Sequence, residues 1–349
     1  MDVEGEQVSW PLRSGELTPH YAELERWLGV HGGRDGLNHL PDGDMQPALA
    51  ATPAEQRFAD AVRQRLGYPV IPSRGFGPAP QGEDPAWPRS SSRGSSLPRA
   101  MATGRTQLLS AHLVEHLLMD AGGDKAIGVV AVDQSNGNRR ELKADLVVLA
   151  ASTIQTVSIM LRSRRGEQSN GLDDPSGRLG TRLMDHVSTS QFFAFPEPVQ
   201  MEQPMLTGAG SFFVPFGRHL PSADFQGGYG LWGGIGRFDP PRWLRRRPSS
   251  ITGFLIGHGE VLPRADNRVT LSERTDRWGV RVPSIACRWS SNELAMVRHM
   301  RASIQACIAA AGGEAKSIKD LFHLPLVEPF LEGAVCLLYT SDAADDLRC

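Results

Sequence analysis

The sequence predicts a mixed chain, α/β in one part and α+β in another: part of a doubly wound domain, followed by a region built on an antiparallel sheet. Two observations carry this prediction. The apolar run from Leu146 to Leu149 has the length and composition of a strand buried on both faces, and it leads through small residues into a helical pattern. Beyond His186, short runs rich in aromatics are separated by Gly and Pro, as in antiparallel sheets.

Composition limits the classes of partner. Lys and Arg total 37 against 39 Asp and Glu, which leaves no excess positive charge for a nucleic acid. The basic cluster at 242–247 is interpreted as a solvated loop because prolines bracket it; nucleic-acid binding is the alternative. No apolar run is long enough for a membrane span, and we expect a soluble protein whose true N-terminus is missing and whose localisation stays open. The four cysteines form no C-x-x-C pair, so structural zinc is not expected.

Residues 1–99 are predicted to form a connecting and lid-like region of helices and long loops. Thr18 and Pro19 are typical of a helix start. Thr52-Pro53-Ala54-Glu55 has the pattern of a capping box, and the helix that follows is expected to end at Gly67. The segment 72–98, rich in Pro, Ser and Gly, is interpreted as a surface excursion, either part of a lid or a plain linker.

Residues 100–185 are predicted to form part of a nucleotide-binding domain. The strand signal between 106 and 150 contains His112 and His116, which a strand would place on one face of a sheet and not around a metal. After the 146–149 strand, Ser152 is in the position of an N-cap. Bare backbone N–H groups at the start of such a helix bind nucleotides in doubly wound folds; an ordinary β-α unit without a ligand is the alternative.

Residues 186–333 are predicted to form a substrate-side region in which segments 191–238 and 251–271 join one antiparallel sheet. Ser290 and Glu293 indicate a second capping box, which opens a long helix over 291–312. The run from Gly228 to Gly233 matches G-x-G-x-x-G by letter. Because glycines and prolines follow where a helix would have to start, we interpret it as a glycine-rich strand and not as a phosphate cradle.

Five segments resemble the glucose–methanol–choline (GMC) oxidoreductases, in the order of that family. The second family signature is matched by S-T-I-Q-T-V-S-I-M-L-R-S-R from Ser152, with departures at Val157, where the family has Pro, and at Arg164, where it has Gly. The other four are similar to the family's WPisy, vGrnLmdH, NRvtL and following strand segments: 10–30, 179–186, 267–271 and 278–293. The resemblance spans about residues 10–333.

The resemblance implies an FAD-binding domain over 100–185, a substrate-binding domain over 186–333, and hydride transfer from the CH–OH group of an alcohol, sugar or polyol to flavin N5. It implies that the backbone of Val114 contacts the adenine of FAD, and small residues permit close approach of the flavin at Ala150, Ala151 and Ser152. Asp185 and His186 match a stretch that is structural in the family; an acid–base pair is the alternative.

The same resemblance places a glycine-rich FAD fingerprint before Trp10 and a catalytic histidine, in H-x-x-G-T-x-x-M-G, after Gly333. Neither is in this sequence, so we expect a central fragment that is inactive as given and has no catalytic residue of its own. Residues 334–349 resemble translated sequencing adapter, as in metagenomic contigs, and are expected to be a non-native tail; a divergent C-terminus is the alternative. A non-catalytic binding or scaffold protein derived from a flavoprotein, and another two-domain flavoprotein such as an amine oxidase, are the alternatives. The oligomeric state is left open.

Overall fold

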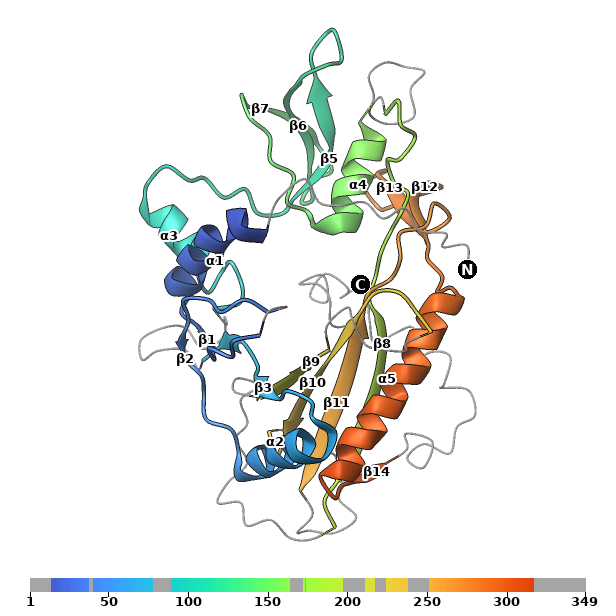
Figure 1. Cartoon of the computed structure of the whole chain (residues 1–349). Helices are drawn as coiled ribbons and strands as arrows, with labels where there is room; N and C mark the ends of the chain where they lie inside the picture. Colours follow the sequence, from blue (N-terminus) through green and yellow to red (C-terminus); the bar gives the residue numbers. More distant parts are fainter. Residues whose placement is uncertain are drawn as a thin grey trace.

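The computed structural model describes residues 14–37, 40–77, 89–163, 172, 174–196, 211–216, 224–237 and 251–316. Figure 1 shows two bodies, one above the other, with an N-terminal segment at their side. We call the lower one the sheet body; it consists of α2, β3, β8 to β11, α5 and β14. The upper one, the hairpin body, consists of β5 to β7, α4, β12 and β13. This confirms the expectation of a mixed chain with antiparallel sheets.

The sheet body is built on one six-stranded antiparallel sheet with the order β14-β8-β11-β10-β9-β3. Its strands are β3 (Ile71–Pro72), β8 (Val187–Ala194), β9 (Phe212–Pro215), β10 (Tyr229–Ile235), β11 (Thr252–Gly259) and β14 (Glu314–Lys316). Its helices are α2 (Pro53–Leu66) and α5 (Ser291–Ala310). Gly230 and Gly233 lie inside β10, paired with β11, so the prediction of an extended run there is confirmed.

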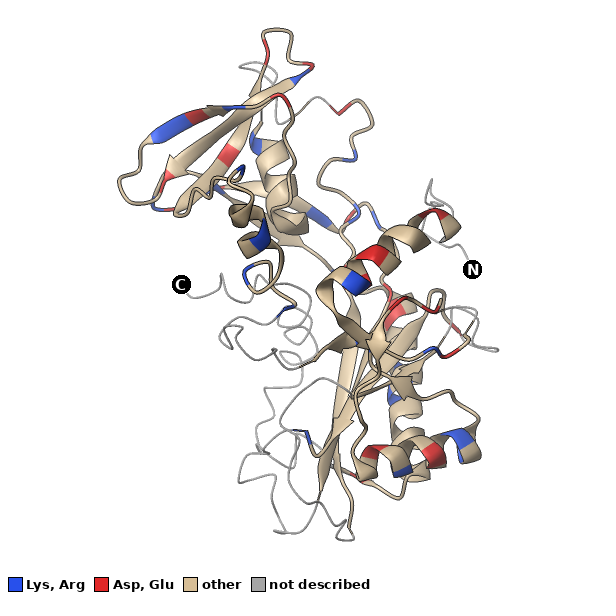
Figure 2. Cartoon of the chain, turned by 90° about the vertical axis from the view of Figure 1, so that its left-hand side faces the viewer, with Lys and Arg blue, Asp and Glu red and all other residues tan. Residues whose placement is uncertain are grey.

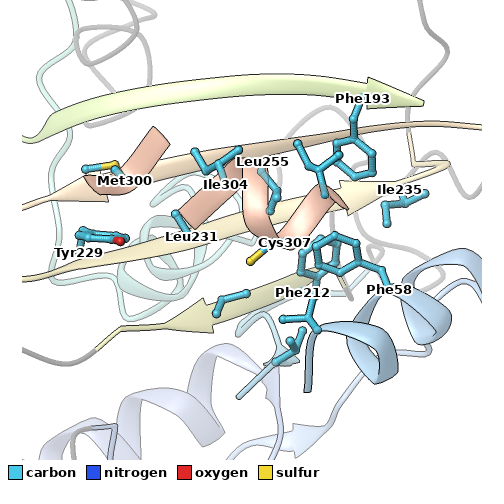
Figure 3. Packing of buried hydrophobic residues seen from close by; sticks show 14 of the residues in the cluster. Phe58, Phe193, Phe212, Tyr229, Leu231, Ile235, Leu255, Met300, Ile304 and Cys307 are labelled. Carbon is cyan, nitrogen blue, oxygen red and sulfur yellow. The ribbon is translucent and has the colours of Figure 1, made fainter. Parts of the chain in front are cut away.

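The core of the sheet body lies between one face of the sheet and the two helices (Figure 3). Phe58 of α2 stacks on Phe193 with the ring centroids 6.0 Å apart, and it contacts the tilted ring of Phe212 with the centroids 4.6 Å apart. Cys307 of α5 is fully buried in this core, and burial raises the pKa of its thiol to about 12.

Two glycines of β11 let α5 approach the sheet closely. A Cβ added at Gly257 would overlap the side chain of Met300, and one added at Gly259 would overlap Met296. Both methionines are fully buried against these positions. The small residues in β11 therefore set the depth at which α5 packs.

Both helices of the sheet body begin at a capping box, as predicted. Thr52 and Glu55 cap α2 reciprocally, and Ser290 and Glu293 cap α5. Glu55 also forms a buried ion pair with Arg237 at the end of β10, with Arg237 Nε 2.6 Å from Glu55 Oε1. The start of α2 is thereby fixed to the end of a central strand.

The hairpin body consists of two antiparallel sheets with a helix between them. Its elements are β5 (His112–Met119), β6 (Ala126–Asp133), β7 (Arg139–Lys143), α4 (Ser152–Arg162), β12 (Arg268–Thr275) and β13 (Arg281–Ala286). The first three strands form one sheet in the order β5-β6-β7, and β12 pairs with β13 in a hairpin. Helix α4 packs against β5 on one side and against the hairpin on the other.

This arrangement corrects two predictions. Residues 268–271 do not join the large sheet, because β12 pairs with β13 and packs on α4. Residues 146–149 are not a central buried strand: Leu146 is 79% exposed and Val148 is 77% exposed. The ladder with β6 ends where Ala144 N–H donates to Ile127 C=O, and no described strand pairs with the residues after it. A strand is buried on both faces only where neighbours cover it.

The N-terminal segment contains the short elements β1 (Val30–Gly32), β2 (Gln46–Pro47) and β4 (Gly75–Phe76), with helices α1 (Ser14–Leu28) and α3 (Ser96–Ala102). Helix α1 begins at Ser14 and has Pro19 inside it, so the predicted start at Thr18 is wrong by one turn. Its apolar residues Tyr21 and Leu24 are exposed. Among the described residues the only parallel pairing is that of β1 with β2, so the doubly wound domain stays a prediction.

Several expectations fall outside the described residues: residues 78–88 of the excursion at 72–98, the basic cluster at 242–247 and the tail at 334–349. The limits of the predicted domains are not tested, although α2, from the region 1–99, packs on the sheet of the region 186–333. In the described part of the chain, acidic and basic residues are interspersed over both bodies (Figure 2). None of the helices in that part has the length and apolar character needed to cross a membrane.

Candidate functional site

The N-terminus of α4 is the candidate ligand-binding feature of the hairpin body. Residues Ala150, Ala151 and Ser152 lead into the helix, and no side chain caps it. The first N–H groups of a helix have no partner within the helix, and they carry the positive end of its dipole. Small residues before such a terminus leave room for an anionic group to approach the backbone.

Ser152 is not the N-cap that the sequence predicted. It is the first helical residue, and its φ of 62° lies in the left-handed region. Ala151 occupies the cap position, and its N–H donates to Thr156 Oγ1 at 3.3 Å. A serine in this conformation is strained, because the Cβ crowds the backbone. Strain of this kind in a non-glycine residue is a recurrent feature of ligand sites.

The other end of α4 is fixed to β5 and β13. Arg162 Nε donates to Glu115 C=O at 2.7 Å, and its Nη1 donates to Arg281 C=O at 3.0 Å. Burial lowers the pKa of Arg162, although not enough to discharge a guanidinium at neutral pH. Ser163 Oγ accepts from Leu117 N–H at 2.8 Å. These contacts hold α4 in a fixed direction.

Glu115 adds a link between β5 and β7. Its carboxylate accepts from Arg139 Nε at 2.8 Å and from Arg139 Nη2 at 2.9 Å. The hydrogen bond from Arg139 holds the pKa of Glu115 below its usual range. Arg139 also donates to Trp278 C=O at 3.3 Å, so the same pair reaches the β12–β13 hairpin.

Val114 lies in β5, half-buried and opposite Ala131 of β6. A β-bulge follows between Val114 and His116. The bulge breaks the alternation that the sequence predicted would place His112 and His116 on one face; the strand itself is confirmed. Helix α4 meets β5 at Glu115 and Leu117 through its last turn, and an 11-residue helix is about 16 Å long. Val114 and Ser152 are therefore next to different ends of α4, and only an extended ligand contacts both.

A histidine pair lies at the end of the large sheet that faces the hairpin body. His186 precedes β8 and His258 lies in β11, with ring centroids 5.9 Å apart. Burial, with the neighbouring His186 ring, lowers the pKa of His258, so this imidazole is neutral at pH 7. Asp185 Oδ1 accepts from the backbone N–H of His186 at 2.7 Å. The sequence did not indicate His258, because strand pairing alone brings it to His186.

Ser188 lies opposite His258 in the register of β8 and β11. It is 2% exposed, and among the described residues its hydroxyl has no hydrogen-bond partner. Tyr229, by contrast, is satisfied inside the core: its hydroxyl is 2.7 Å from His299 Nδ1 and 2.8 Å from Ser303 Oγ. Burial raises the pKa of Tyr229 to about 12, so the phenol stays protonated.

The described side chains do not form a metal site, since no group of three His, Cys, Asp or Glu residues among them is close enough. The geometry instead offers two features. One body has an uncapped helix terminus with small residues and a strained Ser152, and the other has two histidine rings packed together, of which His258 is neutral. The uncapped N-terminus of α4 is suited to bind an anionic group.

Comparison with known proteins shows what this part of the chain is similar to. The model of the GMC oxidoreductase family matches residues 52–188, which run from the cap of α2 through β5 to β7 and α4 to the start of β8. The chain is 28% identical to 6'''-hydroxyparomomycin C oxidase of Streptomyces lividus over 89% of its own length and 59% of the relative. It is 27% identical to paromamine 6'-oxidase of Streptomyces fradiae over 99% of its length and 64% of the relative.

A more distant relative is the fructose dehydrogenase large subunit of Gluconobacter japonicus, 23% identical over 77% of this chain and 54% of that protein. The chain spans about three fifths of the length of the first two relatives. All three relatives are oxidases or dehydrogenases by name. The match over residues 52–188 confirms the resemblance to the GMC oxidoreductase family that the motifs predicted.

Proposed function

We propose that this chain is part of an FAD-dependent oxidoreductase that acts on the CH–OH group of a small-molecule alcohol, sugar or polyol. The family is FAD-dependent, and the relatives described above are named for the oxidation of 6'''-hydroxyparomomycin C, paromamine and fructose. The observation that carries the proposal is the backbone at Ala150, Ala151 and Ser152, where small residues and a left-handed φ open an uncapped helix terminus.

The residues present fit FAD at two separate places. Ala150, Ala151 and Ser152 would contact it at the N-terminus of α4, and the backbone of Val114 would contact its adenine near the other end of the helix. A dinucleotide is long enough to contact both. Bound FAD supplies a hydride acceptor at the flavin ring.

The sheet body would form the wall of the substrate pocket in this proposal. We assign no catalytic base to a described residue, because His186, His258 and His299 lie outside any segment that resembles the family's catalytic motif. Their positions fit other tasks, since His299 bonds Tyr229 in the core and His186 packs on His258.

Selective ¹⁵N labelling of alanine tests the cofactor site without requiring activity. On titration with millimolar FAD, the amide resonances of Ala150 and Ala151 should shift, while those of Ala309 and Ala310 in α5 should not. Ala151→Leu should abolish the shifts by filling the space before α4. Gln155→Leu, an exposed position one turn further along the same helix, should leave them unchanged.

Two outcomes would contradict the proposal. Absence of any shift at Ala150 and Ala151 would favour a non-catalytic protein derived from a flavoprotein. Shifts confined to other alanines would place the ligand elsewhere and would favour another class of flavoprotein.

We further expect that this polypeptide, as purified, shows no visible flavin absorbance and no dye reduction with a panel of alcohols. The sequence has no glycine-rich turn that opens a helix, so the strongest anchor for the pyrophosphate is lacking. The lack of a positioned base costs about 10²–10⁴-fold in rate even with cofactor present. A yellow preparation that oxidises alcohols would contradict the prediction of an inactive fragment.

A further inference from the structure

Three connections of the chain pass directly between the hairpin body and the sheet body, without the N-terminal segment between them. Residues 183–186 lead into β8, residues 260–267 lead from β11 to β12, and residues 287–290 lead from β13 to α5. Figure 1 shows these connections between α4 and the hairpin above and the upper ends of β8 and α5 below. The relative orientation of the two bodies depends on how these segments are held together.

All three segments meet at Asn267. Its side-chain Oδ1 accepts from Arg288 N–H at 2.9 Å, and its Nδ2 donates to Arg288 C=O at 3.2 Å. Its backbone C=O accepts from Leu183 N–H at 2.9 Å. Asn267 is 1% exposed, so water does not compete for these bonds.

The chemistry of this contact is specific to asparagine. One planar amide supplies an acceptor and a donor side by side, which matches the N–H and C=O groups of a single residue, here Arg288. A carboxylate would accept from the N–H group but would oppose the C=O group. An alanine would leave both groups of Arg288 unpaired in a buried place.

We infer that Asn267 is a positioning residue that fixes the angle between the two bodies. The inference rests on the proposed function, in which α4 of the hairpin body holds FAD and the sheet body holds the alcohol. The placement of the reacting carbon against the flavin then depends on this angle, and a small rotation about the three connections would misplace it.

The chain contains a matched control within one body. Asn292 makes the same pair of bonds to Gln226: Oδ1 accepts from Gln226 N–H at 2.7 Å, and Nδ2 donates to Gln226 C=O at 3.2 Å. Asn292 lies in α5, and Gln226 lies three residues before β10, so both belong to the sheet body. Substitution at Asn292 removes the same pair of bonds, together with one from its Nδ2 to Glu293 Oε1 in the same helix, and none of these bonds joins the two bodies.

The test measures the distance between the bodies in the full chain. Spin labels carried by unnatural amino acids are placed at Arg57 of α2 and Arg140 of β7, both exposed. In Asn267→Ala the distribution of label–label distances should become about twofold wider, as expected for a loosened hinge. In Asn292→Ala it should match the parent. An unchanged width in Asn267→Ala, or equal broadening in both variants, would overturn the inference.

A second variant separates positioning from a general loss of stability. Asn267→Asp should give the broad distribution at neutral pH and recover the narrow one towards about pH 4, where a carboxyl group takes up a proton and can donate to Arg288 C=O. Circular dichroism at each pH confirms that the variants are folded at the temperature of measurement. A distribution that is narrow at neutral pH, or still broad in acid, would show that the donor to Arg288 does not set the angle.

The measurement uses neither FAD nor substrate, so its failure is distinct from failure of the proposed function. Broadening in Asn267→Ala together with no FAD shift at Ala150 would refute the cofactor assignment and keep Asn267 as the residue that fixes the bodies. An unchanged distribution with a clear FAD shift would refute only the role of Asn267.

Discussion

The two bodies bury their apolar residues to very different extents. The sheet body has a continuous core in which Phe58, Phe193, Leu231 and Leu255 are fully buried. In the hairpin body and the N-terminal segment, large apolar residues face solvent, among them Leu146, Val148 and Tyr21. Both regions have well-formed helices and strands, so secondary structure alone does not account for the difference.

The comparison shows that an apolar residue is buried only where other strands and helices pack around it. Phe193 and Leu146 both lie in apolar runs rich in strand-forming residues, yet the first has a strand on either side and two helices on one face. Leu146 has no paired strand among the described residues. Among the described residues, no layer covers the exposed apolar side chains of Leu146 and Val148, whereas two helices cover the core face of the sheet body.

The largest expected effect contrasts two aromatic residues on helices. Phe58→Ala should lower the free energy of unfolding by about 3–5 kcal/mol, because it removes a ring from a packed core. Tyr21→Ala, at a position that is 60% exposed, should change it by less than about 0.5 kcal/mol. Urea unfolding followed by circular dichroism measures both. Similar losses in the two variants would show that α1 is covered in solution.

The second expected effect concerns charges on one helix. Glu55→Gln keeps the shape of the side chain but leaves Arg237 as a buried cation, and this should cost about 3–5 kcal/mol. Asp60→Asn, on the same helix, breaks an exposed ion pair with Arg63 and should cost less than about 1 kcal/mol. The same urea experiment applies. A small loss in Glu55→Gln would mean that the link between α2 and β10 is not rigid.

The third expected effect is a loss of stability in acid through the cap of α5. Burial would raise the pKa of Glu293, but hydrogen bonds from Ser290, Asn292 and Leu262 outweigh it and hold the pKa below its usual range. A group whose folded pKa is lowered stabilises the fold above its unfolded pKa, about 4.3 for Glu. This contribution is lost as the pH falls through the folded pKa.

Midpoints of urea unfolding measured from pH 7 to pH 3 test whether stability falls in acid as expected. The parent should lose stability in acid, and Glu293→Gln should lose less over the same range because no carboxylate is left to protonate. An acid limb of equal slope in both proteins would assign the loss to other carboxylates, such as Glu115 of the hairpin body.

The smallest expected effect tests the strain next to the candidate cofactor site. Ser152→Gly should stabilise the chain by about 1 kcal/mol, because glycine adopts a left-handed backbone without steric cost. Thr153→Gly, at the next residue, should destabilise it by about 1 kcal/mol, since its backbone is helical and glycine loses more entropy. Thermal unfolding gives both values. Destabilisation by both substitutions would show that Ser152 is not strained.

The sequence predicted well the features whose causes are local. The capping boxes at Thr52 and Ser290, the end of α2 at Gly67 and the extended run from Gly228 are set by residues within one or two turns of each other. The family resemblance was also readable from short motifs in order.

Features that depend on distant partners were not predictable in this way. The apolar run at 146–149 has the composition of a buried strand, but its exposure is decided by which strands lie beside it. Residues 268–271 were assigned to the large sheet because nothing local distinguishes pairing with β13 from pairing with β11. His258 joins His186 only through the register of β8 with β11.

The buried thiol of Cys307 is a chemical probe of how often the core of the sheet body opens. A thiol reacts with alkylating or disulfide reagents only as the thiolate, and a pKa of about 12 with complete burial makes that species negligible in the folded chain. Its modification therefore requires that α5 separate from the sheet. Cys287, in the connection from β13 to α5, is only half-buried and provides a faster internal reference. The ratio of the two labelling rates at these native residues would report how often the core opens.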